Sequence, residues 1–179
     1  MTITINGDGT IGGVSVGGLP DGIVDTDMLA SNAVTSALLP SGSVLQVVSA
    51  NVGGSSVISS SSTYSDTGIS ATITPSFSTS KILIIVNVTG CKKEANNTYL
   101  ALKLLRNSTS LLDFEREGGY NNSTSLQEFG GTGCSYLDSP STTSSTTYKI
   151  QMASVTNQVQ VSINNSSGYS SITLMEIAA

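Results

Sequence analysis

The sequence of 179 residues predicts an all-β fold, with an antiparallel β-sandwich of the jelly-roll kind over residues 43–179. Ten segments with strand composition follow residue 42, separated by clusters of Gly, Ser, Asn and Pro, with no helical pattern between them. Many short strands divided by turn signals are typical of such sandwiches. The expected strands cover residues 43–50, 69–74, 81–89, 98–106, 111–117, 124–129, 134–138, 146–153, 158–163 and 171–177.

The stretch 66–88 gives the clearest strand signals. Apolar residues from Ile69 to Ile73 alternate with Ser and Thr, as in a strand with one face in water. The run 82–86 is apolar on both faces, so its second face must also be covered. We therefore assign Leu83 and Ile85 to a subunit interface. The expected core residues are Ile69, Ile73, Leu100, Leu102, Leu104, Ile150, Met152, Val159, Val161 and Ile163.

Residues 1–42 are expected to form a connector, made of a short strand and a helix, that precedes the sandwich domain. A Gly-punctuated, strand-like region over 2–18 precedes a turn at 19–22, and an apolar stripe predicts a helix over 26–39. A lone helix of this length is marginal in water and must pack against a partner. Small alanines would let three copies approach closely, so we predict a homotrimer. Its connector contacts would include Met28, Leu29, Ala33 and Ala37.

The composition argues against several partners. Only 11% of the residues are charged and the net charge is −5, whereas nucleic acids and anionic membranes attract basic surfaces. No apolar run approaches the length of a membrane span, and the first residues lack the basic and apolar regions of a signal peptide. We therefore expect no nucleic acid, no membrane insertion and no Sec export.

The residue types also argue against common catalytic and cofactor sites. Histidine is absent, which removes the base of Ser-His-Asp and Cys-His mechanisms. Residues 7–12 fit GxGxxG, but a strand-like segment comes next in place of the helix that a dinucleotide site requires. Cys91 and Cys134 form no CxxC pair, which argues against a metal or other cofactor. The expected strand order places them at opposite ends of the strands, about 20 Å apart, so we expect two free thiols.

Acidic residues are the remaining candidates for chemistry. Strand alternation would place Asp113, Glu115 and Glu117 on one face, with Arg116 on the other. Such a face could bind calcium or hold a glycosidase pair, but a solvated strand face beside an arginine explains it more simply. Aspartates in 21–27 fit the cap and first turn of the expected helix.

Three groups of motifs resemble a known family. The segment 66–88, DTGISATITPSFSTSKILIIVNV, resembles the start of the C-terminal β-domain of bacteriophage tail-fibre proteins, where TGxxATITPSxxxSKILI recurs. YLDS at 136–139, TYKI at 147–150 and ITLMEI at 172–177 resemble the end of that domain. Within 1–42, GGLPDGIVDTDMLASNAVT resembles the attachment and linker segment of the same proteins. The strand pattern also resembles that of the jelly-roll heads of trimeric tumour-necrosis-factor-like and C1q-like proteins.

The resemblance implies a non-enzymatic virion protein, assembled in the host cytoplasm and released on lysis. It would be a short homotrimeric tail fibre, docked on other virion proteins through residues 1–42, that attaches non-covalently to a glycan or protein of the host surface. A capsid decoration or head-fibre protein with the same module is the alternative. A glycan depolymerase using the three carboxylates is a further one.

Loop residues at the end of the sandwich away from the connector are the expected receptor contacts. Strand alternation gathers the loops 51–68, 90–97, 118–123, 139–145 and 164–170 there. Tyrosine rings offer rigid faces for stacking, and amides and ammonium groups supply hydrogen bonds. The candidates are Tyr64, Lys92, Lys93, Tyr120, Asn121, Asn122 and Tyr169.

Overall fold

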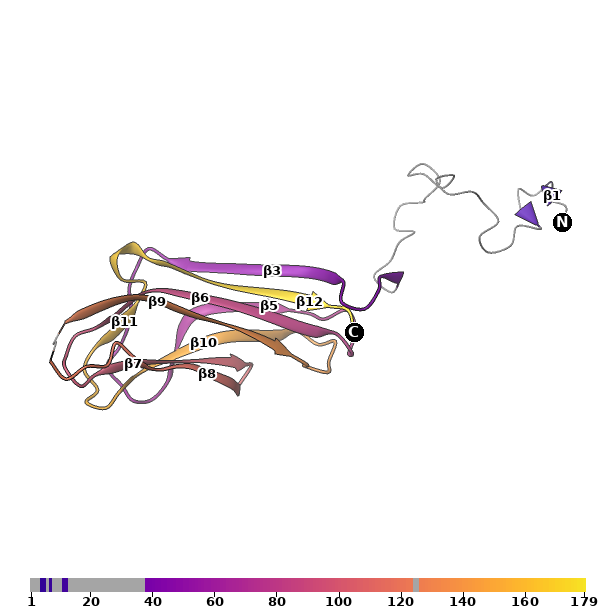
Figure 1. Ribbon diagram of the computed structural model, residues 1–179. Coiled ribbons are helices and arrows are strands. Elements are labelled where there is room, and N and C mark those ends of the chain that lie inside the picture. The colour runs from indigo at the N-terminus through magenta and orange to yellow at the C-terminus, as the bar shows by residue number, and fades with distance from the viewer. Residues whose placement is uncertain (1–3, 6, 8–10, 13–37, 124–125) are drawn as a thin grey trace. The chain divides into compact units, whose positions relative to one another are not determined.

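The computed structural model describes residues 4–5, 7, 11–12, 38–123 and 126–179 (Figure 1). The chain divides into two units, Met1–Leu39 and Pro40–Ala179. In the first unit, β1 (Thr4–Ile5) and β2 (Ile11–Gly12) form a short antiparallel pair. Residues 26–37 of the expected helix lie outside the described residues, and with them the expected connector contacts Met28, Leu29, Ala33 and Ala37.

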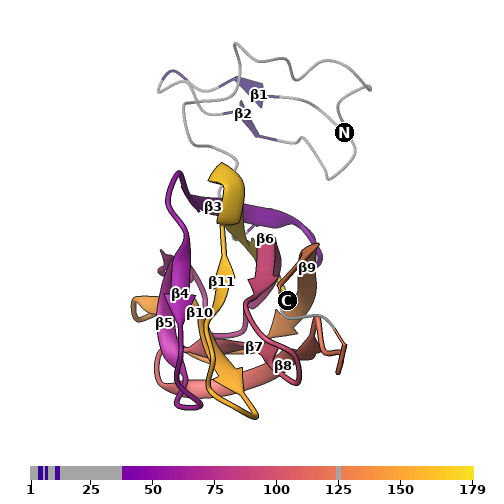
Figure 2. The ribbon, with the colours of Figure 1, turned by 90° about the vertical axis from the view of Figure 1, so that its left-hand side faces the viewer.

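The second unit, which we call the head, is a sandwich of two antiparallel sheets (Figures 1 and 2). One sheet has the order β5-β10-β7-β8, and the other has the order β3-β12-β6-β11-β4, with β9 paired to β6. The strands are β3 (Val44–Gly53), β4 (Val57–Ser59), β5 (Ser65–Ile73), β6 (Lys81–Lys93), β7 (Tyr99–Arg106), β8 (Thr109–Gly118), β9 (Gln127–Asp138), β10 (Thr146–Val155), β11 (Val161–Ile163) and β12 (Tyr169–Ile177). A 3-10 turn, η2, spans Asn165–Ser167.

The strand order confirms the predicted jelly roll. Without the short β4 and β11, the first strand of the head lies beside its last, and the second lies beside the last but one. This nesting of strands in two sheets defines a jelly roll. We call the end holding Val44, Lys81, Asp138 and Ile177 the base, and the opposite end the tip. At the base the Gly42 amide donates to the Ala178 carbonyl at 2.8 Å, so the two ends of the head chain are neighbours.

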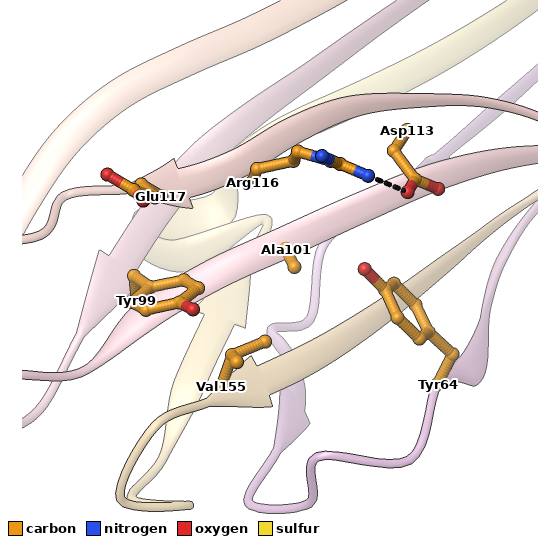
Figure 3. A pocket seen from close by; sticks show the side chains of 7 residues that line it. All are labelled: Tyr64, Tyr99, Ala101, Asp113, Arg116, Glu117 and Val155. Carbon is orange, nitrogen blue, oxygen red and sulfur yellow. Dashed lines mark hydrogen bonds and ion pairs between the residues drawn. The ribbon is translucent and has the colours of Figure 1, made fainter.

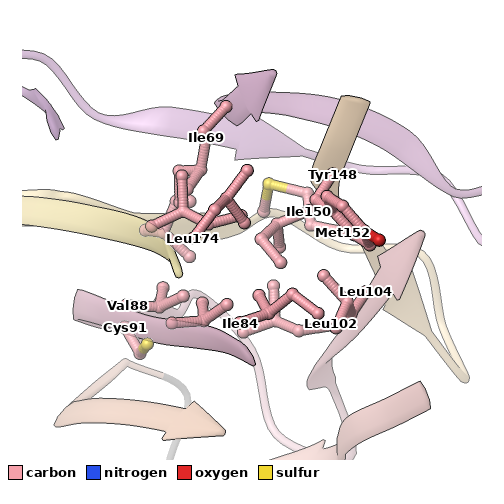
Figure 4. Packing of buried hydrophobic residues seen from close by; sticks show 14 of the residues in the cluster. Ile69, Ile84, Val88, Cys91, Leu102, Leu104, Tyr148, Ile150, Met152 and Leu174 are labelled. Carbon is pink, nitrogen blue, oxygen red and sulfur yellow. The ribbon is translucent and has the colours of Figure 1, made fainter. Parts of the chain in front are cut away.

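The core lies between the sheets, where inward side chains from both layers interdigitate (Figure 4). Strand β5 shows the expected alternation, because Ile69, Ala71 and Ile73 are buried while the residues between them are exposed. All but one of the predicted core residues are buried. The exception is Val159, which is half-buried because it precedes β11 in the turn after β10.

Strand β9 differs from the prediction of two separate strands. It runs without a break through Gly130 and Gly131, which the sequence pattern placed in a turn. Gly130 has φ +88°, and the register against β6 shifts at this point, so the glycine forms a bulge that other residues rarely allow. One strand in place of two reverses the direction of the chain beyond it. The loop 139–145 therefore lies at the base, and not at the tip as expected.

The two cysteines are free, as predicted, but for a different reason. They lie on the adjacent strands β6 and β9, where Cys91 is opposite Gly130 and Cys134 is opposite Val86. Gly130 and Cys134 are four residue steps apart along β9, which is about 13 Å. A disulfide spans at most about 7 Å between Cα atoms. Burial, together with the charge of Glu115, raises the pKa of Cys91 to about 12, and burial raises that of Cys134 to about 11.

We expect both thiols to be inert in the folded protein. Thiolates are the reactive form, and at pH 8 both thiols remain protonated, with Cys91 buried and Cys134 half-buried. Titration with Ellman's reagent should give no fast reaction from the native protein and two thiols per chain in guanidinium without reductant. A thiol that reacts rapidly in the native protein would contradict the burial of that cysteine.

A buried carboxylate at the base accounts for one group of the motif residues. Glu176 of ITLMEI is fully buried. It accepts hydrogen bonds from Gln46 Nε2 at 2.5 Å, from the Ser76 amide at 2.7 Å and hydroxyl at 3.1 Å, and from the Phe77 amide at 3.4 Å. Burial opposes ionisation, but the hydrogen bonds from Gln46 and Ser76 outweigh it and lower the pKa of Glu176. The TPSFSTS segment is therefore held to β12 and β3 by one carboxylate.

A second buried carboxylate joins the two sheets. Asp138 of YLDS accepts from the Tyr148 hydroxyl of TYKI at 2.6 Å and from Arg106 Nη1 at 2.9 Å. Asp138 lies on β9, whereas Tyr148 and Arg106 lie on the neighbouring strands β10 and β7 of the other sheet. Burial and the Asp138 charge raise the pKa of Tyr148, so its hydroxyl stays a donor. The motifs YLDS and TYKI thus also stabilise the fold at the base.

Candidate functional site

A pocket of about 280 Å³ opens on the outer face of the β5-β10-β7-β8 sheet, near the tip (Figure 3). The alternation that turns Leu100, Leu102 and Leu104 of β7 inward turns the residues between them outward. Tyr99 and Ala101 therefore line the pocket from β7. The full lining is Tyr64, Tyr99, Ala101, Asp113, Arg116, Glu117 and Val155.

Irregular pairing of β8 brings the charged residues to this face. Asp113 is opposite the outward Lys103, whereas Glu115 is opposite the inward Leu102, so one extra residue lies between them on β8. A second register shift lies between Leu102 and Leu100. Such bulges change which side chains share a face. Arg116 therefore joins Asp113 on the outer face.

The predicted row of three carboxylates on one face is therefore wrong. Glu115 is half-buried, and its charge contributes to the raised pKa of the buried Cys91. It accepts from the backbone amides of Arg116 at 3.1 Å and Glu117 at 3.3 Å. Asp113 forms an ion pair with Arg116, whose Nη2 lies 3.0 Å from its carboxylate. Glu117 remains with Asp113 on the pocket wall.

Contacts among the pocket side chains fix their positions. The Lys103 ammonium lies 4.0 Å from the centre of the Tyr64 ring, in a cation–π contact. Tyr120 packs edge-on against Tyr99, with ring centres 5.8 Å apart and planes at 81°. Figure 3 shows the Tyr64 hydroxyl directed toward the ion pair of Asp113 and Arg116. The pocket is thus arranged before any ligand arrives.

The electrostatics of the pocket are balanced. Two carboxylates, Asp113 and Glu117, line the pocket with the Arg116 guanidinium, and the Lys103 ammonium lies against the Tyr64 ring beside them. Partial burial and the Asp113 charge raise the pKa of Tyr64, so its hydroxyl is neutral and can donate. The Asp113 carboxylate raises the pKa of Arg116, which stays charged. The site therefore offers neutral and charged hydrogen-bonding groups without a net field of either sign.

The structure brings two of the predicted receptor residues together. Tyr64 lines the pocket, and Tyr120 supports its Tyr99 wall. Tyr169 is 65% exposed but lies on the other sheet, opposite Gly53, where its ring occupies the space that a Cβ at Gly53 would need. It covers a glycine, as aromatic residues do across strands.

The other predicted receptor residues lie away from the pocket lining. Lys93 was expected at the surface, but it is fully buried, and its ammonium donates to Asn121 Oδ1 at 2.9 Å. Lys92 is paired with Glu94 at 2.6 Å. Asn121 donates to Gln127 Oε1 at 2.5 Å, and Asn122 is exposed.

Sequence reasoning missed Tyr99, Lys103 and Arg116. A signal was available for the first two, because assigning Leu100, Leu102 and Leu104 to the core places their neighbours on the outer face. Nothing in the pattern LLDFERE marked the bulges that expose Arg116.

The opposite sheet presents a different surface at its base. Val47, Met175, Leu83 and Leu137 lie side by side in register across β3, β12, β6 and β9. We call this row and its neighbours Val44, Ile177 and Ile85 the apolar face. Val47 is 55% exposed, Leu137 51% and Ile85 41%. In this described half of the sheet, Lys81 is the only outward charged side chain of the strands.

Within the described ranges, no three Cys, Asp or Glu side chains gather as metal ligands do. Nor does that part of the chain contain a helix of the length and apolar character that crosses a bilayer.

Comparison with known proteins gives little further guidance. No family model matches the chain, and no curated protein sequence matches it. Among solved structures it is similar to the infectious bursal disease virus VP2 subviral particle, with a TM-score of 0.39 and 12% identity. The match covers 76% of this chain and 34% of the VP2 chain. A similarity this distant carries no argument about function. The functional argument therefore starts from the two outer faces of the sandwich.

Proposed function

We propose that the chain is a virion structural protein, a short homotrimeric bacteriophage tail fibre whose head attaches non-covalently to the host surface. The observation that carries this proposal is the difference between the two outer faces of the sandwich. One face has an exposed apolar row with a single charge, whereas the other has a preformed polar and aromatic pocket. An association surface and a separate binding surface are what an oligomeric attachment protein needs.

The apolar face supports self-association. Monomeric proteins rarely expose large contiguous apolar patches, and those they do expose are often interaction sites. The expected interface residues Leu83 and Ile85 both point outward on this face. Three heads packed by these faces would leave the pocket of each sandwich on the outside. The connector at residues 1–42 would then hold the three chains together and dock on other virion proteins.

The resemblance to tail fibres also supports the proposal, in a particular way. Its motif residues build the buried carboxylate clusters of Glu176 and Asp138 at the base, so they describe the fold and not the ligand. The pocket residues lie outside those motifs. Proteins that attach to different hosts need a shared fold and a contact site whose residues can change independently of it. The separation of the motif residues from the pocket residues provides this. Three weak sites per fibre, and several fibres per particle, would give strong attachment through avidity.

Binding without hydrolysis suits the carboxylates better than a depolymerase does. A glycosidase needs two carboxyls facing one sugar across a cleft. Here Glu115 faces away from the pocket, and of the two carboxylates that line it, Asp113 and Glu117, the first is held in an ion pair with Arg116.

Three measurements test the proposal. Light scattering of the purified full chain should return three times 18.3 kDa, about 55 kDa. The purified protein should compete with the phage for adsorption to host cells. Immunogold labelling of intact particles should mark the tail. A monomer at micromolar concentration contradicts the trimer, and label on the capsid shell replaces the tail fibre with a decoration protein.

A further inference from the structure

We propose that the tip pocket binds one ring of a neutral sugar, through its tyrosine walls and the Asp113–Arg116 pair. This inference rests on the proposed attachment function and names the ligand class of its site. A glycan is chosen over a protein because the apolar part of the lining, beyond the tyrosine rings, is limited to Ala101 and Val155. Apolar side chains of a protein partner would find little to bury there.

The aromatic walls suit the flat faces of a sugar ring. Tyr99 and Tyr64 come from different parts of the chain and line the same hollow of about 280 Å³ (Figure 3). The face of a tyrosine ring carries negative charge density, and the C–H groups of a sugar face are weakly positive. Because Tyr120 and Lys103 already pack on these two rings, little side-chain entropy would be lost on binding.

The polar groups match hydroxyls on neighbouring carbons. One Asp113 oxygen accepts from Arg116, which leaves further lone pairs of that carboxylate open to accept a hydroxyl proton. Arg116 has donors beyond the one it uses, and Glu117 and the Tyr64 hydroxyl lie on the same rim. Paired donors and acceptors in a fixed plane recognise vicinal hydroxyls, each of which both donates and accepts.

The charge balance selects a neutral sugar. A phosphorylated or sialylated glycan would meet Asp113 and Glu117, and a cationic ligand would meet Arg116 and Lys103. The positions that a cationic ligand would take are already occupied by side chains of this chain. Arg116 forms an ion pair with Asp113, and Lys103 lies over the Tyr64 ring. A ligand without charge gains the hydrogen bonds and avoids both repulsions.

The test uses the full chain and saturation-transfer NMR with glucose, galactose, mannose, N-acetylglucosamine and N-acetylgalactosamine. Glucose 6-phosphate and N-acetylneuraminic acid serve as charged probes. At least one neutral sugar should bind, and Tyr99→Ala and Asp113→Asn should each weaken it about tenfold or more. Tyr99→Phe, which keeps the ring, should bind normally. Tyr169→Ala is the matched control, because it removes an exposed tyrosine from the other sheet.

Each outcome decides the inference. Binding of no neutral sugar, stronger binding of a charged probe, or equal binding by Asp113→Asn and wild type overturns it, and Asp113→Asn remains decisive if Tyr99→Ala does not fold. Adsorption competition separates it from the attachment proposal. If the full chain blocks phage adsorption but binds no neutral sugar, only the sugar site is refuted. If the full chain binds a sugar in the pocket but does not block phage adsorption, only the attachment function is refuted.

Discussion

Replacing Glu176 by Ala should lower the free energy of unfolding by roughly 3–5 kcal/mol, enough to remove much of the stability of a typical domain. The substitution removes the acceptor of the partly buried Ser76 and Phe77 donors, and it leaves Gln46 Nε2 with only its bond to the Thr74 carbonyl. A fully buried donor left unsatisfied costs about 1–3 kcal/mol, and access of water to these partly buried donors reduces the sum. Urea unfolding at fixed protein concentration measures the change, since association would also affect stability.

Two further variants make this result specific. Glu176→Gln should cost less, about 1–2 kcal/mol, because one oxygen can still accept both amides of the 76–77 segment. Glu94→Ala removes a carboxylate from an ion pair near the surface and should change stability by less than about 1 kcal/mol. A loss of similar size for Glu94→Ala and Glu176→Ala would contradict the role of the buried cluster.

The same carboxylate predicts how stability depends on pH. The pKa of Glu176 is lowered in the folded head, so the folded state favours the ionised form. Its contribution is complete above the unfolded carboxyl pKa of about 4.3 and is lost as pH falls through the lower folded pKa. The advantage of wild type over Glu176→Gln should therefore shrink as pH falls from about 5 toward 3. An advantage that is constant over this range would contradict the assignment.

The sandwich was predictable because side-chain alternation in strands is a local property. Each inward apolar residue of β5, β7 and β10 can be assigned from its neighbours alone, and the buried Ile69, Leu102 and Ile150 follow that pattern. The turn signals then separate the strands, and their number leaves few architectures. The jelly-roll order itself was inferred from this count and is confirmed by the pairing.

The pocket was only partly predictable, because bulges and burial depend on partners distant in sequence. The pairing of β8 with β7 contains register shifts, and at each shift the side chains of β8 change faces. Arg116 therefore lies on the outer face, although simple alternation along β8 would place it on the inner one. Lys93 was expected in a loop, yet β6 extends to include it and buries it. Gly130 and Gly131 were assigned to a turn because the backbone of β6, their pairing partner, is not visible in the local sequence.

Replacing Leu83 by Asp should convert the proposed trimer into a monomer of 18.3 kDa. Leu83 lies in the row between Met175 and Leu137, so the change would place a charge near the middle of the apolar face of each copy. Burying an unpaired carboxylate costs several kcal/mol, which weakens association by about a thousandfold or more. Sedimentation velocity over a range of concentrations measures this change.

Two controls separate association from folding. The side chain of Leu83 points outward, so the variant should keep the circular dichroism spectrum of the wild-type head. Ile58→Asp is the matched control, because Ile58 is 58% exposed on β4, away from the apolar row, and this variant should remain a trimer. If Leu83→Asp still sediments as a trimer, the apolar face is not the contact and association depends on the connector. If Ile58→Asp dissociates as well, added charge alone disrupts the assembly, and the face loses its special role.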